Sequence, residues 1–411
     1  MMKLLNVDTL EEAFEKLLNA AEQIKLKTKM FSLTEAGGKI LAEDIVAAYS
    51  VPDFRRSTVD GYAVRAADTQ GAGDSIPCFL KVIGDVSIGT SAEGSVKSGQ
   101  CMYVPTGGML PEGADAMVMV EHTELFSETQ IAVYDAVSAG RNVIQIGEDT
   151  KEGTVVLRRG QQLNPSRIGV LASLGYDTVR VFEQPTITIL STGNELVKPG
   201  QARRPGQICD INTYGIQAQC VRAGLQVIHT DVLPDEEEHL RNAILHAAQC
   251  SDIVAVSGGS SQGKQDYTEK IFNECSDGGV FTHGLSLKPG KPTILGMDQR
   301  HQSLLIGLPG HPMAAMVVFD LLALGVLRRR MGVSEKRRMP ARMAVNVAGG
   351  NGRTVCQMVQ LQPGENGIYL AQPLLGKSGL ISVLAKADGY VMINADKEGL
   401  KKGEAVEVTP L

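Results

Sequence analysis

A chain of 411 residues, 43% hydrophobic and 21% charged, is long enough to form two to four domains. Its net charge is −6, it lacks Trp, and only 4% of its residues are aromatic, so nucleic acid is not an expected partner. No apolar run reaches transmembrane length, and the seven scattered cysteines lack zinc-binding spacing, so we expect no membrane partner and a cytoplasmic location.

The first part of the chain predicts helices on either side of a β-rich region. Thr9-Leu-Glu-Glu begins an amphipathic helix, and residues 32–47 predict a second short helix. From about residue 76 to 163, short alternating runs are separated by Gly, Pro and Asp, which is typical of β structure. Residues 164–175 predict a helix with Asn164 as its N-cap.

From Pro185 onward, strands and helices alternate. The strands are predicted at 186–193, 225–233, 253–259, 293–297 and 303–310, and the helices at 212–224, 235–250 and 311–329. Such alternation implies right-handed crossovers and a mostly parallel sheet. After a basic stretch at 328–342, short runs separated by Gly, Pro and Asn predict a small β-barrel or sandwich.

Polar groups follow several of these strands, at the sheet edge where α/β proteins bind anions. The segment SGGSSQGKQD (257–266) offers backbone and hydroxyl donors from Ser257, Gly258, Gly259 and Ser260. Its spacing is neither that of a dinucleotide-binding loop nor that of a P-loop. Asp266 either caps the next helix or belongs to a site.

Two proline-rich turns flank the same predicted strands. In KPGKP (288–292), Lys288 and Lys291 can both face an anion, although a solvated basic turn is the alternative. In LPGHP (308–312), Pro309 and Pro312 fix the start of the following helix.

Carboxylates stand at corresponding places in other loops. Glu195 and Asp235 each follow a strand, and together with Asp266 they would suit Mg²⁺, which takes oxygen ligands and keeps several waters. Asp60, Thr106 and Asp149 lie beside glycines outside the predicted sheet, and by pattern alone each is a β-turn residue.

Six motifs, in order, carry a resemblance that covers about residues 7 to 408. They are VDGYAVRAADT, PTGGMLPEGADAMVMVE, SGG-x₄-DYT, KPGKP, LPGHP and KSGLISVLAKADGYV. Together they resemble the molybdopterin molybdenumtransferase family, which includes the bacterial MoeA group and the gephyrin E-domain. The resemblance implies a multidomain α/β plus β fold and an elongated subunit that forms a homodimer.

The implied subunit has four parts. They are an N-terminal or linker domain (1–50 with 140–180, partly helical), a β-rich inserted domain (51–139), a molybdopterin-binding three-layer α/β domain (181–330) and a C-terminal β-barrel (335–411). The implied activity is insertion of molybdate, with tungstate as an alternative, into adenylylated molybdopterin with release of AMP, assisted by Mg²⁺. The alternative is a non-catalytic molybdopterin-binding or scaffold protein on the same fold.

The resemblance also implies roles for residues. The positions that matter for activity are Asp60, Thr106, Asp149, Glu195, Asp235 and Asp266. The substrate-binding positions are Ser257, Gly258, Gly259, Ser260, Lys288, Lys291, Pro309 and Pro312. Lys264 stands where the family commonly has an acidic residue, so we expect Mg²⁺ to depend on Asp235 and Asp266. His311 stands where Asn is frequent, and Arg55-Arg56 replaces a smaller polar pair.

Overall fold

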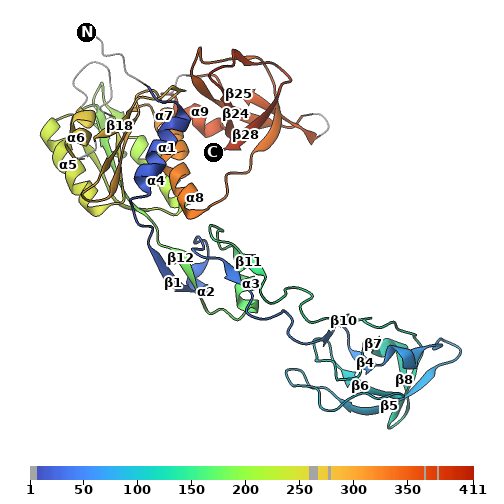
Figure 1. The fold of residues 1–411 in the computed structure, drawn as a ribbon. Coiled ribbons are helices and arrows are strands. Elements are labelled where there is room, and N and C mark those ends of the chain that lie inside the picture. The colour runs from blue at the N-terminus through green and yellow to red at the C-terminus, as the bar shows by residue number, and fades with distance from the viewer. Residues whose placement is uncertain (1–6, 259–266, 276–278, 365–366, 377–378) are drawn as a thin grey trace.

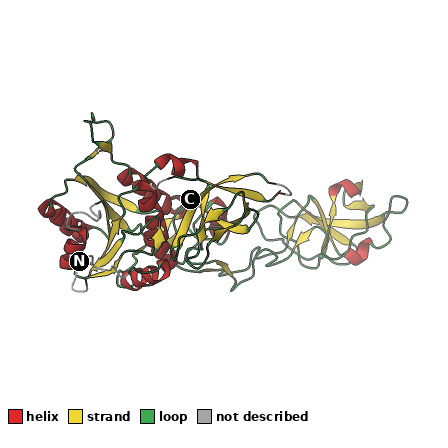
Figure 2. Ribbon diagram, turned by 90° about the horizontal axis from the view of Figure 1, so that it is seen from above, coloured by secondary structure: helices red, strands yellow, loops and turns green. Residues whose placement is uncertain are grey.

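The computed structural model describes residues 7–258, 267–275, 279–364, 367–376 and 379–411. The molecule is elongated: the α/β domain and the C-terminal barrel form one end, a small middle piece follows, and the β-rich domain forms the other end (Figure 1). Seen from above, the β-rich domain is again set apart at one end of the molecule (Figure 2). Within the described ranges, no helix is both long and apolar enough to cross a membrane.

The α/β domain is built on a six-stranded sheet in the order β16-β13-β17-β21-β20-β18. The first four strands are parallel, and β20 alone runs in the opposite direction, antiparallel to both β21 and β18, so the sheet is mostly parallel as predicted. The strands are Thr186–Thr192 (β13), Gln226–Leu233 (β16), Ile253–Ser257 (β17), Val280–His283 (β18), Ile294–Asp298 (β20) and Ser303–Leu308 (β21). Three of these strands, β17, β20 and β21, are buried along their whole length, which explains their apolar sequences.

Helices cover both faces of this sheet, which confirms the three-layer prediction. One face carries α1 (Leu10–Ala21), α4 (Asn212–Ala223) and a helical segment made of α7 (Pro312–Val318), π-helical η3 (Phe319–Leu324) and α8 (Gly325–Met331). The other face carries α5 (Glu237–Cys250) and α6 (Tyr267–Cys275). A short parallel pair, β14 (Leu196–Val197) and β15 (Ile208–Cys209), precedes α4.

The first helix packs on the α/β sheet. Its predicted start is confirmed by a capping box, in which Thr9 Oγ1 accepts from the Glu12 N–H at 3.1 Å and Glu12 Oε2 accepts from the Thr9 N–H at 2.9 Å. The buried Leu17 belongs to the same core as the sheet residues. The structure thus places α1 with the α/β domain, although the resemblance grouped residues 1–50 with 140–180. The other domain boundaries stay predictions.

The middle piece has its own small core. Its elements are β1 (Thr28–Ser32), α2 (Leu33–Ala36), β2 (Ile45–Val46), β11 (Val155–Leu157), α3 (Pro165–Ser173) and β12 (Thr178–Phe182). The predicted helix at 32–47 is wrong beyond Ala36, because Gly37 and Gly38 end it, the latter at φ +78°, and β2 pairs with β11. The helix predicted from Asn164 is confirmed, since Asn164 Oδ1 accepts from the Arg167 N–H at 2.9 Å.

The middle piece touches the α/β domain at a close backbone approach. A Cβ on Gly160 would lie 2.0 Å from the Gly332 carbonyl oxygen, so only glycine fits there. Next to it, Arg159 donates to the Arg330 carbonyl oxygen at 2.6 Å and lies over the Phe182 ring. These contacts form a joint that sets the angle between the two parts.

The β-rich domain contains a six-stranded sheet in the order β7-β4-β6-β5-β9-β8, with a core cluster on each side. Its elements are β3 (Arg56–Ser57), β4 (Gly61–Val64), η1 (Ala66–Thr69), β5 (Cys78–Asp85), β6 (Gln100–Val104), β7 (Ala116–Met119), η2 (Val120–His122), β8 (Thr123–Ser127), β9 (Gln130–Val133) and β10 (Val143–Ile144).

The C-terminal strands close into a five-stranded barrel, β24-β25-β22-β28-β26, which a β24–β26 pairing completes. Its elements are β22 (Met339–Met343), β23 (Val347–Ala348), β24 (Thr354–Gln362), β25 (Tyr369–Pro373), α9 (Ile381–Lys386), β26 (Gly389–Ile393), β27 (Gly399–Leu400) and β28 (Ala405–Pro410). A strand before β20, β19 (Leu287–Lys288), pairs with β24 and joins the barrel to the α/β domain. The predicted fold class is confirmed.

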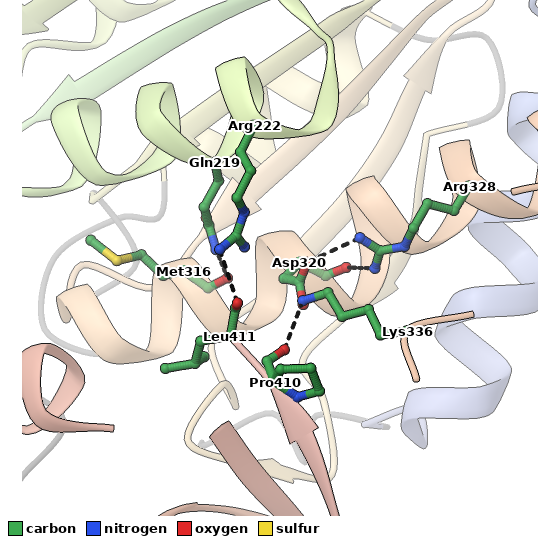
Figure 3. Close-up of polar contacts among 8 residues, drawn as sticks. All are labelled: Gln219, Arg222, Met316, Asp320, Arg328, Lys336, Pro410 and Leu411. Atoms are coloured by element: carbon green, nitrogen blue, oxygen red, sulfur yellow. Dashed lines mark hydrogen bonds and ion pairs between the residues drawn. The ribbon is translucent and has the colours of Figure 1, made fainter. Parts of the chain in front are cut away.

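Polar contacts anchor the end of the barrel to the α/β helices (Figure 3). Asp320, on the π-helical turn, is 4% exposed and accepts from Arg328 at 3.1 Å and Lys336 at 2.8 Å. Lys336 also donates to the Pro410 carbonyl oxygen at 3.1 Å, and Arg222 donates to that of Leu411 at 2.9 Å. The last strand of the barrel is therefore tied to η3 and α4.

Candidate functional site

The sheet has a topological switch point between β13 and β17. The helix after β13 is α4 and the helix after β17 is α6, and these lie on opposite faces of the sheet. Ser191 and Ser257 are register partners at the carboxyl ends of the two strands. A cleft of about 1220 Å³ opens at this edge and continues to the barrel. Open α/β sheets bind ligands in crevices of this kind.

One side of the cleft is acidic. Asp235 follows β16, where its Oδ1 accepts from the Thr192 hydroxyl at 2.5 Å and its N–H donates to Asn194 Oδ1 at 3.1 Å. Glu195 lies in the loop after β13, and its carboxylate folds back over Gly193. Both carboxylates line the cleft. The hydrogen bonds hold Asp235 at the ends of β13 and β16.

The other side is cationic. Because β20 runs antiparallel to β21, the turn before it lies at the edge where the parallel strands end. That turn carries Lys288 and Lys291, and pairing of β19 with β24 brings Arg353 of the barrel to the same cleft. Three cations on one side of a cleft suit a phosphate or another oxyanion.

The loops between these sides require their small and rigid residues. Gly258 has φ +108°, and a Cβ there would lie 2.2 Å from the Thr192 carbonyl oxygen. Asn212 Nδ2 donates to Ser257 Oγ at 2.6 Å and to the Gly310 carbonyl oxygen at 2.9 Å, so it ties two loops together. Pro312 is the first residue of α7 and Pro309 precedes it in the same loop.

Most of the α/β residues predicted from the sequence lie together. The cleft is lined by Glu195, Asp235, Ser257, Gly258, Lys288, Lys291, Pro309 and Pro312. Three further predicted residues, Gly259, Ser260 and Asp266, lie outside the described residues.

The remaining predicted residues do not line this cleft. Asp60 and Thr106 are together in the β-rich domain, where Asp60 Oδ1 accepts from the Thr106 N–H at 2.8 Å. Asp149 lies in the connecting segment and donates its N–H to the Val51 carbonyl oxygen at 3.2 Å. The β-rich domain lies at the opposite end of the molecule from the α/β domain and the barrel (Figure 1), whose residues line the cleft. One chain therefore does not bring the two groups together.

The structure adds cleft residues that the sequence did not predict. Arg353 follows a glycine-rich turn, and only the fold places it beside the lysines. Asp210 follows β15, a strand of two residues, and Asn212 begins α4, so neither follows a strand that the sequence pattern reveals. Cys356 also lines the cleft, but burial, with a smaller effect of Asp320, raises the pKa of its thiol, so it is no candidate nucleophile.

The acidic side fits a magnesium ion that arrives with a phosphorylated ligand. In the described part of the chain, no group of three or more His, Cys, Asp or Glu side chains could hold a metal. Magnesium, however, is commonly held by one or two carboxylates together with substrate phosphates and waters. Asp235 can supply such a carboxylate, which does not require a complete protein cage.

The fold and the cleft define a multidomain protein whose α/β domain has, at its switch point, a cleft suited to an anionic ligand. Three family regions match in order: the MoeA N-terminal region (domain I and II) at residues 8–175, a domain described as "Probable molybdopterin binding domain" at 188–329, and the MoeA C-terminal region (domain IV) at 340–411.

Known proteins match over nearly the whole chain. The molybdopterin molybdenumtransferase of Haemophilus influenzae is 32% identical over 408 residues, covering 98% of each chain, and that of Staphylococcus epidermidis is 30% identical over 403 residues, covering 97% of this chain and 94% of the relative. A crystal structure of a molybdopterin biosynthesis MoeA protein from Pyrococcus horikoshii has a TM-score of 0.83 and 34% identity, covering 98% of this chain and 99% of that one. This chain belongs to the molybdopterin molybdenumtransferase (MoeA) family.

Proposed function

We propose that this protein is a molybdenum insertase that transfers molybdate into adenylylated molybdopterin and releases AMP. The observation that carries the proposal is the cleft, in which Glu195 and Asp235 lie on one side and Lys288, Lys291 and Arg353 on the other. Family membership supports the proposal, since two relatives bear the name molybdopterin molybdenumtransferase.

Each side of the cleft has a separate task in this proposal. The cations hold the oxyanion, either molybdate or tungstate, which have the same charge and shape. Lys288 lies on β19, the strand that also pairs with the barrel. Asp235 and Asp266 are the proposed ligands of Mg²⁺, which when bound would neutralise charge on the phosphates. The Thr192 hydroxyl keeps the Asp235 carboxylate oriented for that task.

We further propose a homodimer in which the β-rich domain of one chain reaches the cleft of the other. Support comes from the separation of the paired Asp60 and Thr106 from the cleft within one chain (Figure 1). Asp149 would join the shared site from the connecting segment. The proposed location is the cytoplasm, where the seven free cysteines stay reduced.

Release of AMP from adenylylated molybdopterin tests the function. AMP should appear only when molybdate and Mg²⁺ are both present. Lys288→Ala should raise the molybdate concentration for half-maximal release about tenfold or more, because it removes a charged contact. Lys397→Ala, which removes a surface ion pair with Glu404 in the barrel, is the charge-matched control and should change nothing.

Two results would count against the proposal. AMP release that is independent of molybdate would contradict transfer of the metal. Binding of molybdopterin without any AMP release would favour the non-catalytic binding or scaffold alternative.

A further inference from the structure

Two buried oxygen atoms at the cleft have no hydrogen-bond partner among the described residues. They are Oδ2 of Asp210 and Oδ1 of Asn212, and their residues are only 3% and 7% exposed. Both residues line the cleft. Buried polar atoms are nearly always paired, and one left without a donor costs about as much free energy as a lost hydrogen bond. A bound ligand that supplies donors would remove this cost.

The rest of each side chain is already committed. Oδ1 of Asp210 accepts from the Ser191 hydroxyl at 3.1 Å and from the Thr213 N–H at 3.3 Å. Both donor bonds of Asn212 Nδ2 go to Ser257 and Gly310. Turning either side chain to find a partner for its free oxygen would break these bonds. The two side chains are therefore held in orientations that leave Oδ2 of Asp210 and Oδ1 of Asn212 without a hydrogen bond to the described part of the chain.

Their location separates them from the cationic side. Ser191 and Ser257, which hold the two side chains, end β13 and β17 at the switch point. The turn with Lys288 and Lys291 begins β20, and β21 lies between β17 and β20 in the sheet. A ligand that spans the cleft would thus place its anionic part near β20 and a part rich in hydrogen-bond donors near β13 and β17.

A metal ion explains the two oxygens less well than N–H groups do. Where the structure describes the chain, no cluster of three or more His, Cys, Asp or Glu surrounds them. Only Asp210 is charged, since Asn212 offers a neutral amide oxygen. A 2-amino-4-oxopyrimidine ring, by contrast, presents a ring N–H and an exocyclic NH₂ side by side, which a carboxylate and a neighbouring carbonyl-type oxygen can accept.

We propose that Asp210 and Asn212 bind the N–H edge of the pterin ring of the substrate. This inference rests on the proposed function, which supplies a pterin-bearing substrate. Asp210 accepts from the amino edge, and Asn212 both accepts from it and holds the loops after β17 and β21 in place. The two residues are binding residues, and they determine which heterocycle the cleft accepts.

The test uses two probes that differ only at this edge. The fluorescent 6-hydroxymethylpterin carries the 2-amino group, and the matched lumazine carries an oxygen there. In fluorescence titrations of the full-length protein, the pterin should bind about tenfold or more tightly than the lumazine. Asp210→Asn should remove most of that preference by weakening the pterin alone, because an amide NH₂ can then face the ligand NH₂.

The variant is chosen to spare the fold. An asparagine at 210 keeps an oxygen for the Thr213 N–H at the start of α4. Asp231→Asn is the matched control, since Asp231 is half-exposed on β16 and pairs with Lys198; it should leave both affinities unchanged. The preference of the unaltered protein tests the inference even if Asp210→Asn unfolds.

Three results would overturn the inference. One is equal binding of pterin and lumazine by the unaltered protein, and another is a pterin preference that survives Asp210→Asn. The third is calorimetric binding of Mg²⁺ alone that Asp210→Asn abolishes, which would assign the oxygens to a cation. Molybdate-dependent AMP release without a pterin preference would contradict only this inference. A pterin preference without AMP release would contradict only the proposed insertase function.

Discussion

Loss of the Asp320 carboxylate should weaken the attachment of the barrel to the α/β domain. Its side chain is 6% exposed and faces Arg328 and Lys336, which are 27% and 23% exposed. After Asp320→Ala, each cation keeps one carbonyl partner, at Asp320 itself and at Pro410, but neither keeps an anion. Removing one partner of a buried ion pair costs about 3–5 kcal/mol. Because both cations reach some solvent, we expect a loss near the lower end, about 3 kcal/mol.

The assay is urea unfolding followed by far-UV circular dichroism at one fixed protein concentration. Glu335→Ala is the control, because Glu335 is 85% exposed and its ion pair with Arg338 is long, at 3.7 Å. Its loss should change the free energy of unfolding by less than about 0.5 kcal/mol. Replacing Asp320 by Leu together with Lys336 by Met should recover part of the loss, because one unpaired cation is then removed. The reasoning is refuted if Asp320→Ala costs less than about 1 kcal/mol.

Three further predictions concern the cleft, the dimer and alkaline stability. Gly258→Ala should abolish pterin binding, because its Cβ would lie 2.2 Å from a backbone carbonyl oxygen. Gly140→Ala, also at positive φ but in open space, is the control and should lower stability without changing pterin affinity. Fluorescence titration of the two variants with pterin compares their affinities. At molybdate concentrations too low to support release by Lys288→Ala, co-expression of Asp60→Asn with Lys288→Ala subunits should restore about a quarter of the AMP release, since half of the dimers are mixed and each has one intact site. No restoration would contradict a shared site. Burial raises the pKa of the Cys220 thiol to about 12, whereas the unfolded thiol ionises near 9, so its stabilising contribution is present below pH 9 and lost as pH rises toward 12. Urea midpoints at pH 8 to 10 should therefore fall less steeply in Cys220→Ala.

Much of the α/β domain was predictable because local and tertiary preferences agree there. Gly224 ends α4 with φ +76°, in the left-handed region that glycine favours. The fully buried β17 and β21 are apolar except for one serine at an end of each, Ser257 and Ser303. The helix at 32–47 failed because its apolar spacing also suits short strands. Pairing of Ile45 with Leu157, more than a hundred residues away, decided the outcome.

The candidate site was predictable only where its residues follow recognisable strands. Glu195 and Asp235 come after β13 and β16, whose patterns are clear. Asp210 follows β15, a strand of two residues that leaves no periodic signal. Arg353 reaches the cleft through the pairing of β19 with β24, and no local pattern in the sequence encodes a contact between two domains.

The joint at Gly160 and Gly332 has a consequence for the far end of the molecule. The middle piece and the β-rich domain, which carries Asp60, extend away from this joint (Figure 1). A small rotation at this joint displaces each part of the β-rich domain by a distance that grows with its separation from the joint. A larger residue at position 160 would therefore shift the β-rich domain, and Asp60 with it, relative to the α/β domain, while the side chains that line the cleft stay unchanged.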